Sequence, residues 1–292
     1  MLSVLIPTYN YNAFELVNEL HKQLLKSKVQ FEIICVDDGS KSTLNQQNEK
    51  INALANARFY PLKDNVGRSA IRNYLSEEAA YNWLLFLDSD VLPASPLFID
   101  NYLKEASQKT GAVFCGGIRY LASDENKKLL RYKYGVKFEE MNVDKRNKRP
   151  YKFFFTANFL IYKATFNKIR FEEKLIKYGR EDLLFSQTLK ARGFPVIHLK
   201  NEVYHHGIDT DAAFVLKTKH AMENIAFLAD TNLILPKDGN LLKTVYYFSL
   251  FGISYAVGKL TPYFEKKAIK NASIFYLNCF KVSYLCSLKK AL

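Results

Sequence analysis

Residues 83–90 read WLLFLDSD, so five apolar residues lead directly into two carboxylates that are separated by one serine. A short, continuous apolar run predicts a buried central strand of a parallel α/β sheet, and the carboxyl ends of such strands open onto the ligand crevice. We therefore expect Asp88, Ser89 and Asp90 at a ligand site. Because carboxylates one residue apart point to opposite sides of a strand, the turn after Leu87 must redirect one of them if both are to reach the same metal-bound phosphates. The alternative is a pair of solvated loop acids.

The rest of the chain supports an α/β fold. Strand-like apolar runs at residues 3–7, 31–36 and 112–115 alternate with segments of helical periodicity, as in a parallel sheet covered by helices. Strand character returns at residues 153–162 and 196–199. Nothing repeats at a fixed period, which excludes a solenoid.

Composition indicates a globular protein. With 292 residues, of which 48% are hydrophobic and 24% charged, the chain can bury a full core. The start of the chain has no basic leader and enters strand-like sequence at once, which predicts a cytoplasmic protein without a secretory signal. The four cysteines show no metal-ligand pattern, so reduced thiols are expected.

The net charge of +13 is concentrated in two segments. Residues 127–152 hold ten Lys or Arg and three acids, and residues 241–292 hold eight Lys and one Glu, which is a net charge of +7 in each. The remainder is nearly neutral. We do not expect nucleic acid as a partner, because neither segment is a recognised module or has its aromatic signature. The first segment belongs to a polar, tyrosine-rich stretch, residues 116–152, that we expect to cross the active face.

The first of three further motifs, PTYN at residues 7–10, follows the first predicted strand. Tyr9, two residues after Pro7, can lie flat against a base. The alternative is a plain strand-to-helix turn in which Asn10 or Asn12 caps the helix.

The other two motifs also fall where a strand turns into a helix. Residues 37–40, DDGS, combine adjacent carboxylates with a glycine turn and can accept the imino hydrogen of uracil and a ribose hydroxyl; an ordinary Asp-Gly turn is the alternative. Residues 65–73, NVGRSAIRN, place Arg68 and Arg72 near a helix start, which suits a diphosphate, with capping and surface arginines as the alternative. Neither a G-x-G-x-x-G nor a Walker motif is present, so nothing supports a nicotinamide cofactor.

Taken in order, PTYN, DDGS, N-x-G-x-S-x-x-R-N and D-x-D closely resemble glycosyltransferase family 2 over residues 1 to about 92. The resemblance implies a GT-A fold and transfer of a sugar from a nucleotide diphosphate with inversion at the anomeric carbon. Tyr9 and Asp38 resemble the base-binding residues of the family. By position, the residues implied to bind the donor are Pro7, Tyr9, Asp38, Asn65, Gly67, Arg68, Asp88 and Ser89.

The second half of the chain offers a base for this reaction. An inverting transfer needs a group that takes the proton of the acceptor hydroxyl, and a carboxylate is the usual choice. Glu181 and Asp182 resemble the E-D motif of the family, in which the Asp is the base. We expect Asp182 to be the base, with Glu181 as the alternative; both acids are also favourable in a first helical turn without any catalytic role.

A histidine pair follows the next predicted strand, where several GT-A enzymes have a metal-binding histidine. An imidazole from His205 or His206, together with the oxygens of Asp88 and Asp90, gives a mixed site that is compatible with Mn²⁺ or Mg²⁺. Phosphate contact and simple exposure remain alternatives for both histidines. Residues 156–158 resemble the acceptor-side strand of the family.

The C-terminal part, residues 216–292, is expected to be helical and basic, following a GT-A domain over residues 1–215. On a helical wheel, residues 264–282 form one amphipathic helix with lysines opposite an aromatic face, which suits an anionic membrane surface. Packing on the catalytic domain with solvated lysines is the alternative. Residues 245–258 carry no charge but are too few to span a bilayer.

These features predict a metal-dependent inverting glycosyltransferase that uses a nucleotide-sugar donor, preferably a uridine diphosphate sugar. The expected acceptor is a glycan or a lipid-linked molecule in cell-surface polysaccharide or glycolipid synthesis. We expect peripheral contact with the cytoplasmic face of a membrane through residues 241–292. Two alternatives stay open: a sugar-phosphate nucleotidyltransferase, which typically has a Gly-rich basic loop after its first strand, and a non-catalytic membrane-associated scaffold.

Overall fold

The computed structural model describes residues 1–107, 111–235 and 239–288, and the chain divides into two compact units. The first unit consists of residues 1–121, 136–176 and 181–207, and the second of residues 122–135, 177–180 and 208–292. The boundary predicted at residue 215 falls inside helix α9 (Asp211–Asp230), which belongs wholly to the second unit. As a functional division it stays a prediction.

A seven-stranded sheet forms the centre of the first unit, in the order β3-β2-β1-β4-β8-β6-β9. Its strands are β1 (Leu2–Thr8), β2 (Phe31–Asp37), β3 (Ala57–Pro61), β4 (Trp83–Leu87), β6 (Val113–Cys115), β8 (Asn158–Tyr162) and β9 (Val196–His198). β4 is central, as predicted, and pairs in parallel with β1, while β8 runs antiparallel to both of its neighbours. The predicted α/β class is confirmed, although the sequence does not predict β3.

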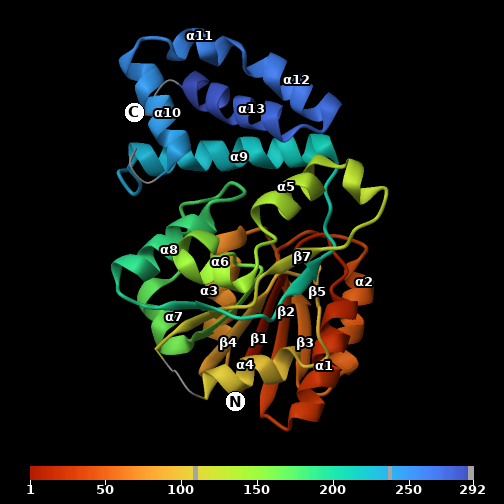
Figure 1. The fold of residues 1–292 in the computed structure, drawn as a ribbon. Coiled ribbons are helices and arrows are strands. Elements are labelled where there is room, and N and C mark those ends of the chain that lie inside the picture. The colour runs from red at the N-terminus through yellow and green to blue at the C-terminus, as the bar shows by residue number, and fades with distance from the viewer. Residues whose placement is uncertain (108–110, 236–238, 289–292) are drawn as a thin grey trace. The chain divides into compact units, whose positions relative to one another are not determined.

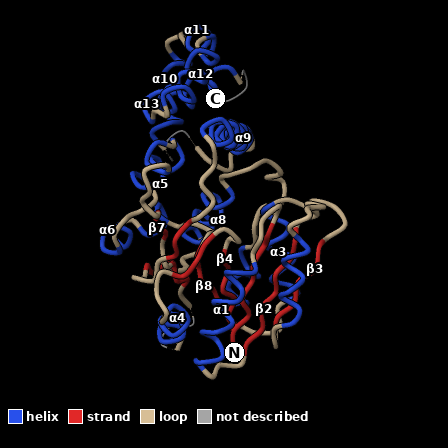
Figure 2. Tube along the Cα trace, turned by 90° about the vertical axis from the view of Figure 1, so that its right-hand side faces the viewer, coloured by secondary structure: helices blue, strands red, loops and turns tan. Residues whose placement is uncertain are grey.

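Helices cover both faces of this sheet (Figure 1). They are α1 (Phe14–Ser27), α3 (Arg68–Glu78), α4 (Phe98–Ala106), α7 (Lys163–Ile169) and α8 (Glu181–Ala191). On the face of α3, α7 and α8 the core is largely aromatic: Phe86 of β4 stacks on Phe159 and Phe166, with ring centroids 4.8 and 5.1 Å apart. The strands lie as one layer between these helices in Figure 2. Burial of these rings holds β4, and hence the residues that follow it, in place.

A second, smaller sheet joins three short strands in the order β5-β10-β7. They are β5 (Val91–Pro93), β7 (Ile118–Tyr120) and β10 (Val203–His205). β10 runs antiparallel to β5, with His205 opposite Val91, and parallel to β7, with His205 opposite Tyr120. The sequence does not predict β5 and β7, because three residues are too few to show a period. This sheet brings the histidine segment beside the D-x-D turn.

The excursion over residues 116–152 is more ordered than its sequence indicates. It contains β7, α5 (Leu130–Phe138) and α6 (Val143–Lys148), and the strand expected at residues 153–162 begins only at Asn158, the first residue of β8. Two of the ten basic residues at 127–152, Arg131 and Arg146, are buried. The net charge of this segment therefore overstates the charge available at its surface.

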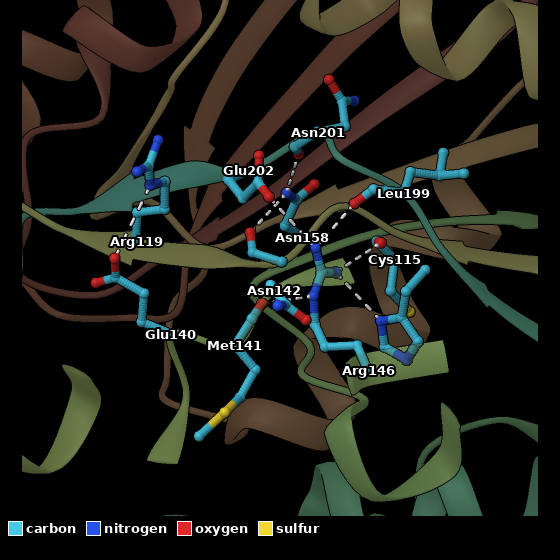
Figure 3. A network of polar contacts seen from close by, with 12 residues as sticks. Cys115, Arg119, Glu140, Met141, Asn142, Arg146, Asn158, Leu199, Asn201 and Glu202 are labelled. Atoms are coloured by element: carbon cyan, nitrogen blue, oxygen red, sulfur yellow. Dashed lines mark hydrogen bonds and ion pairs between the residues drawn. The ribbon is translucent and has the colours of Figure 1, made fainter. Parts of the chain in front are cut away.

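Arg146 is fully buried at the centre of a polar network (Figure 3). Its guanidinium group donates to the carbonyl oxygens of Met141, Cys115 and Leu199 at 2.9–3.2 Å and lies 3.4 Å from the Glu202 carboxylate. The ring of His198 accepts from Arg146 through Nδ1, because its Nε2 contacts the carbonyl oxygen of Pro150. Burial lowers the pKa of His198 to about 4, so the ring is neutral near pH 7. The network ties α6 to β9 and to the segment that leads into β10.

Asn158, at the start of β8, is also used for packing (Figure 3). Its side chain accepts a hydrogen bond from the Tyr102 hydroxyl at 2.6 Å and donates to the carbonyl oxygens of Gly117 and Asn201. Only 2% of the residue is exposed. Asn158 therefore offers no exposed polar group for the acceptor-side role that is expected of residues 156–158.

Helices form the second unit, as predicted for the C-terminal region. They are α9, α10 (Asn240–Leu250), α11 (Ser254–Lys259), α12 (Thr261–Asn271) and α13 (Ile274–Ser287). Within this unit α13 packs against the other four helices and lies between α9 and the α11–α12 pair in Figure 1. Residues 236–238 and 289–292 of the predicted region lie outside the described residues.

The prediction of one amphipathic helix over residues 264–282 is wrong. Helix α12 ends at Asn271, and the next residue, Ala272, adopts a left-handed conformation with φ 43°. Ser273 then caps the start of α13. α13 is the central helix of the unit, so Leu277 and Phe280 are buried, as is Lys281. Among the described helices, none has both the length and the apolar character required to cross a bilayer.

We predict that Arg146→Ala strongly destabilises the first unit. The variant leaves three carbonyl oxygens and Glu202 without their buried donor, and loss of one partner of a buried ion pair typically costs about 3–5 kcal/mol. Urea unfolding followed by circular dichroism measures the change. Arg119→Ala is the matched control, because Arg119 is half exposed and lies 3.9 Å from Glu140. We expect a loss of about 0–1 kcal/mol for the control; equal losses in the two variants would contradict the structural role of Arg146.

Candidate functional site

The motifs predicted to bind a ligand meet at one edge of the large sheet. β1, β2 and β4 run parallel, so the residues that follow Thr8, Asp37 and Leu87 emerge at the same carboxyl edge. Pro7 is held in β1 opposite Val36, whereas Tyr9 is 57% exposed. An exposed aromatic ring at this edge is suited to stack on a flat ligand.

Asp38 connects the end of β2 to the start of α3. One carboxylate oxygen accepts the backbone N–H of Val66 at 2.7 Å, and the other accepts that of Gly67 at 3.0 Å. The next residue, Gly39, has φ +67°, and a Cβ there would lie 2.4 Å from the carbonyl carbon of Asp64, so only glycine allows this approach. Asp38 thereby holds the loop that carries Asn65 against the sheet.

Burial and the two backbone hydrogen bonds have opposite effects on the pKa of Asp38. Burial raises the pKa of its carboxyl group, the two backbone N–H groups lower it, and the net direction is upward. Each oxygen keeps a second lone pair for a ligand. The predicted base contact is therefore compatible with a structural role of the same side chain.

Two arginines on one face of α3 form the charged centre of the site. Arg72 is 2% exposed and donates to Asp88 Oδ1 at 2.5 Å, while its guanidinium lies over the Phe171 ring. Arg68, one turn earlier, donates through Nε to Glu181 Oε1 at 2.6 Å and lies 3.6 Å from Asp88 Oδ2. We refer to Arg68, Arg72, Asp88 and Glu181 as the arginine–carboxylate cluster.

The cluster keeps both carboxylates ionised. Burial alone would raise the pKa of Asp88 and of Glu181, but the positive charges of Arg68 and Arg72 outweigh it and lower both pKa values. Arg72 is sealed from solvent, whereas the Arg68 side chain is 36% exposed. Arg68 is thus the member of the cluster that an anionic ligand can reach.

The two acids at the start of α8 differ in their surroundings. Glu181 is 5% exposed and belongs to the cluster. Asp182 is partly exposed, and its Oδ1 accepts the backbone N–H of Leu183 at 2.7 Å. A buried, ion-paired Glu181 cannot easily take up a proton, whereas the Asp182 residue is partly exposed.

The second acid of the D-x-D pair, Asp90, points toward β10 rather than toward the arginines. Its Oδ2 lies 3.6 Å from His205 Nε2, and its backbone carbonyl accepts the N–H of His206. A Cβ at Gly207 would lie 2.0 Å from Asp90 Oδ2, so a larger residue there would displace the Asp90 carboxylate from this position. Ser89 lies between the two acids and is partly exposed. The turn after Leu87 thus separates Asp88 and Asp90 into two environments.

The predicted metal ligands are only partly brought together. Among the described residues, no three His, Cys, Asp or Glu side chains are grouped so as to hold a metal ion. Asp90 and His205 form a pair, Asp88 is turned to the arginines, and the His206 side chain is exposed. The Nδ1 of His205 is buried without a hydrogen-bond partner in the described chain. A pair of protein ligands fits Mg²⁺ or Mn²⁺, because such ions usually complete their shell with substrate phosphates and water.

Two tyrosines near the site are not among the predicted residues. The pKa of Tyr11 is raised by burial and by the charge of Asp90, so its hydroxyl group lies near that acid. Tyr120 stacks on the His205 ring with centroids 5.6 Å apart, and its hydroxyl donates to Glu139. A signal for Tyr11 exists in the continuation of PTYN, whereas the position of Tyr120 depends on the unpredicted strand β7.

The sheet and the acids at its carboxyl edge define an α/β protein of the GT-A class. A crystal structure of TarS from S. aureus shares 18% sequence identity with the chain, with a TM-score of 0.53, and the match covers 97% of this chain and 55% of that one. The mannosyltransferase PcManGT from Pyrobaculum calidifontis shares 14%, with a TM-score of 0.56, over 99% and 86% of the two chains. At these identities the likeness concerns the fold.

The chain belongs to glycosyl transferase family 2, whose model matches residues 3–172. The family predicted from the four motifs is thereby confirmed. The match ends before Glu181, so it includes neither the histidine segment nor the C-terminal helices α9 to α13.

Curated relatives are longer proteins. Chondroitin synthase from Escherichia coli is 27% identical over 126 residues, which are 43% of this chain and 18% of that protein. Hyaluronan synthase from Pasteurella multocida is 25% identical over 223 residues, 66% and 23% of the two. The poly(ribitol-phosphate) beta-N-acetylglucosaminyltransferase TarS from Staphylococcus aureus is 33% identical over 115 residues, 38% and 18%. The matched part of the chain spans about a fifth of these relatives.

We predict that Asp38→Asn loosens the loop before α3. An amide can accept only one of the two backbone N–H groups, so the other loses its partner, at a cost of about 1–3 kcal/mol in the free energy of unfolding. Hydrogen exchange at the amides of Val66 and Gly67 should become faster, as read by mass spectrometry. Asp64→Asn, at an exposed acid in the same loop, is the control and should leave the exchange of both amides unchanged.

Proposed function

We propose that the protein is a metal-dependent, inverting glycosyltransferase that moves a sugar from a nucleotide-diphosphate donor to a glycan or lipid-linked acceptor. The observation that carries the proposal is the convergence of Asp38, Asp88 and Glu181 at one sheet edge of a chain that belongs to glycosyl transferase family 2. These acids come from three distant segments. They meet beside exposed groups that suit a base, a diphosphate and a divalent cation.

We assign the donor to the carboxyl edge of β1, β2 and β4. The exposed Tyr9 ring stacks on the base, and Asp38 accepts its imino hydrogen through a remaining lone pair. Asn65, Gly67 and Arg68 lie beside the diphosphate, with the partly exposed Arg68 guanidinium supplying positive charge. Pro7 shapes the turn that carries Tyr9. Asp88 accepts a hydrogen bond from a ribose hydroxyl, and the Ser89 hydroxyl donates one to the ribose.

We assign the metal to Asp90 and His205, with Asp88 nearby and His206 less favoured. Support comes from the 3.6 Å separation of Asp90 Oδ2 and His205 Nε2. Mn²⁺ or Mg²⁺ bound there would neutralise the negative charge of the departing diphosphate. PcManGT, which shares the fold, was solved in complex with GDP-Man and Mn²⁺.

We assign the general base to Asp182. As the acceptor oxygen forms its bond to the anomeric carbon, Asp182 takes the hydroxyl proton, and the bond between that carbon and the diphosphate oxygen breaks with its electron pair on the diphosphate. Glu181 is the weaker candidate, because Arg68 and Arg72 hold its carboxylate in the ionised, ion-paired form. The role of Glu181 is then to position Arg68.

We favour a uridine diphosphate sugar as donor and a polysaccharide or glycolipid product. Structures of TarS, which share the fold, contain UDP or UDP-GlcNAc, although PcManGT was solved with GDP-Man. The relatives named as chondroitin, hyaluronan and poly(ribitol-phosphate) enzymes favour a polysaccharide product. We further propose peripheral contact with the cytoplasmic face of a membrane through residues 241–292, which would place the enzyme close to a lipid-linked acceptor.

We predict that the full chain releases nucleoside diphosphate from one member of a panel of sugar nucleotides in the presence of Mn²⁺. Release should be fastest from a UDP-sugar and should stop on addition of EDTA, because the diphosphate would leave without charge neutralisation. A coupled assay of nucleoside diphosphate measures it. Undiminished release in EDTA would contradict the metal assignment. Pyrophosphate formation from a nucleoside triphosphate and a sugar 1-phosphate would instead favour a nucleotidyltransferase.

We predict that Asp182→Asn lowers kcat about 10²–10⁴-fold, the usual contribution of a positioned base, while the Kd for the nucleotide stays within about twofold. Rates come from acceptor-dependent turnover and Kd from calorimetry with UDP. Glu181→Gln is the comparison variant. It removes an ion-pair partner of Arg68, so it should raise the Kd for the nucleotide by a larger factor than it lowers kcat. If Glu181→Gln loses turnover with intact binding and Asp182→Asn does not, the two roles are reversed.

A further inference from the structure

The second unit exposes a group of large apolar side chains on consecutive elements, the C-terminal half of α10, the α10–α11 turn and α11. Phe251 is 74% exposed, Tyr255 66% and Leu250 61%. The other members, each at least 40% exposed, are Tyr246, Tyr247, Ile253 and Leu260. We refer to these seven residues as the apolar surface. Exposed apolar groups of this size typically mark a site of interaction with a protein or a membrane.

Local sequence explains why these residues face outward. Leu242 and Val245 form the buried side of α10, so the opposite side carries Lys243, Tyr247 and Leu250 at helical spacing. α10 ends at Leu250, and Gly252 then adopts φ 70° in the turn to α11. Phe251 and Ile253 in this turn are exposed, and the connection between α10 and α11 lies at a corner of the helical unit in Figure 1.

Exposed lysines flank these seven residues in the sequence. Lys243 precedes them, Lys259 lies between Tyr255 and Leu260, and Lys266 and Lys270 follow; all four lysines are exposed. The Nζ atom of Lys259 lies 4.4 Å from the centre of the Tyr255 ring, so the charge and the aromatic ring share one site. Residues 239–288 contain a single acid, Glu265.

We propose that the apolar surface inserts into the interfacial region of an anionic phospholipid bilayer, with the flanking lysines bound to lipid phosphates. This inference rests on the membrane contact proposed above and identifies the residues that make it. Tyrosines flanked by lysines suit the boundary between acyl chains and headgroups, and an anionic surface complements a segment, residues 239–288, in which exposed lysines outnumber the single acid. The helical face expected from the sequence is not the one that binds, because Leu277, Phe280 and Lys281 of α13 are buried in the unit.

A folded protein partner or a second copy of the chain fits less well. The stretch from Val245 to Gly258 offers no charged side chain with which to orient a protein partner, and a second copy would bring its own flanking lysines against these. A bilayer needs no such pairing, and its negative surface potential attracts the same lysines.

The test uses the full chain and sedimentation with two kinds of vesicle, phosphatidylcholine alone and phosphatidylcholine with phosphatidylglycerol. The wild type should pellet with the anionic vesicles and should be released by high salt. The double variant Leu250→Ser/Phe251→Ser should reduce the partition coefficient at least about tenfold, since each buried apolar side chain contributes more than a tenfold factor. The matched control Leu25→Ser/Leu97→Ser removes two leucines of the first unit that are 55% and 56% exposed, and should bind vesicles as the wild type does.

The outcomes separate the inference from the proposals on which it rests. Circular dichroism and nucleoside diphosphate release without vesicles check that the double variant folds and keeps its donor site. No binding by the wild type would overturn membrane contact altogether. Equal binding by the wild type and the double variant would overturn the assignment to this surface but leave membrane contact standing. A dimer that dissociates only in the double variant, without vesicle binding, would assign the surface to a second copy and overturn the bilayer.

Discussion

The contact of Arg72 with Asp88 is the constraint on which the rest of the site depends. The guanidinium group is sealed from solvent, and an unpaired charge at such a depth would cost several kcal/mol, on the order of 3–5. The carboxylate of Asp88 at the end of β4 offsets most of this cost, Glu181 lies 4.0 Å from the same guanidinium group, and Arg68 donates to Glu181 at the start of α8. α3, β4 and α8, which are far apart in the chain, are therefore fixed relative to one another by charge as well as by the aromatic core beneath them.

This constraint divides the acids of the site into two kinds. The arginines keep Asp88 and Glu181 ionised, and backbone N–H groups fix the position of the Asp38 carboxylate. All three acids therefore stabilise the fold in the absence of a ligand. Asp90 and Asp182 are not members of the cluster and remain partly exposed. In the proposed mechanism the first kind orients the donor, while the second kind meets the cation and the acceptor. A site whose charged groups are positioned in advance needs little reorganisation when the reaction occurs.

Much of this arrangement follows from local sequence. The apolar run before Asp88 defines a central strand, and PTYN and DDGS mark where neighbouring strands end, so their convergence could be predicted from the rule that parallel strands share a carboxyl edge. The strands β5 and β7 could not be predicted, since they are too short to have a period and exist only because β10 pairs with both. The prediction of one helix over residues 264–282 was wrong for a related reason. Periodicity reveals neither the end of the helix at Ala272 nor the packing of α13 against four other helices.

By itself, the sequence determined the fold class, the family and the chemical types present at the site, because these depend on strand periodicity and on motifs whose residues are close in the chain. Only the tertiary structure decided what each charged group does. Asp88 and Asp90 are equivalent in the sequence, yet one pairs with buried arginines and the other lies beside His205. Glu181 and Asp182 are adjacent, yet one is buried and the other is partly exposed. Burial and the nearest opposite charge distinguish the members of each pair, and both depend on residues in distant segments of the chain, which no local pattern records.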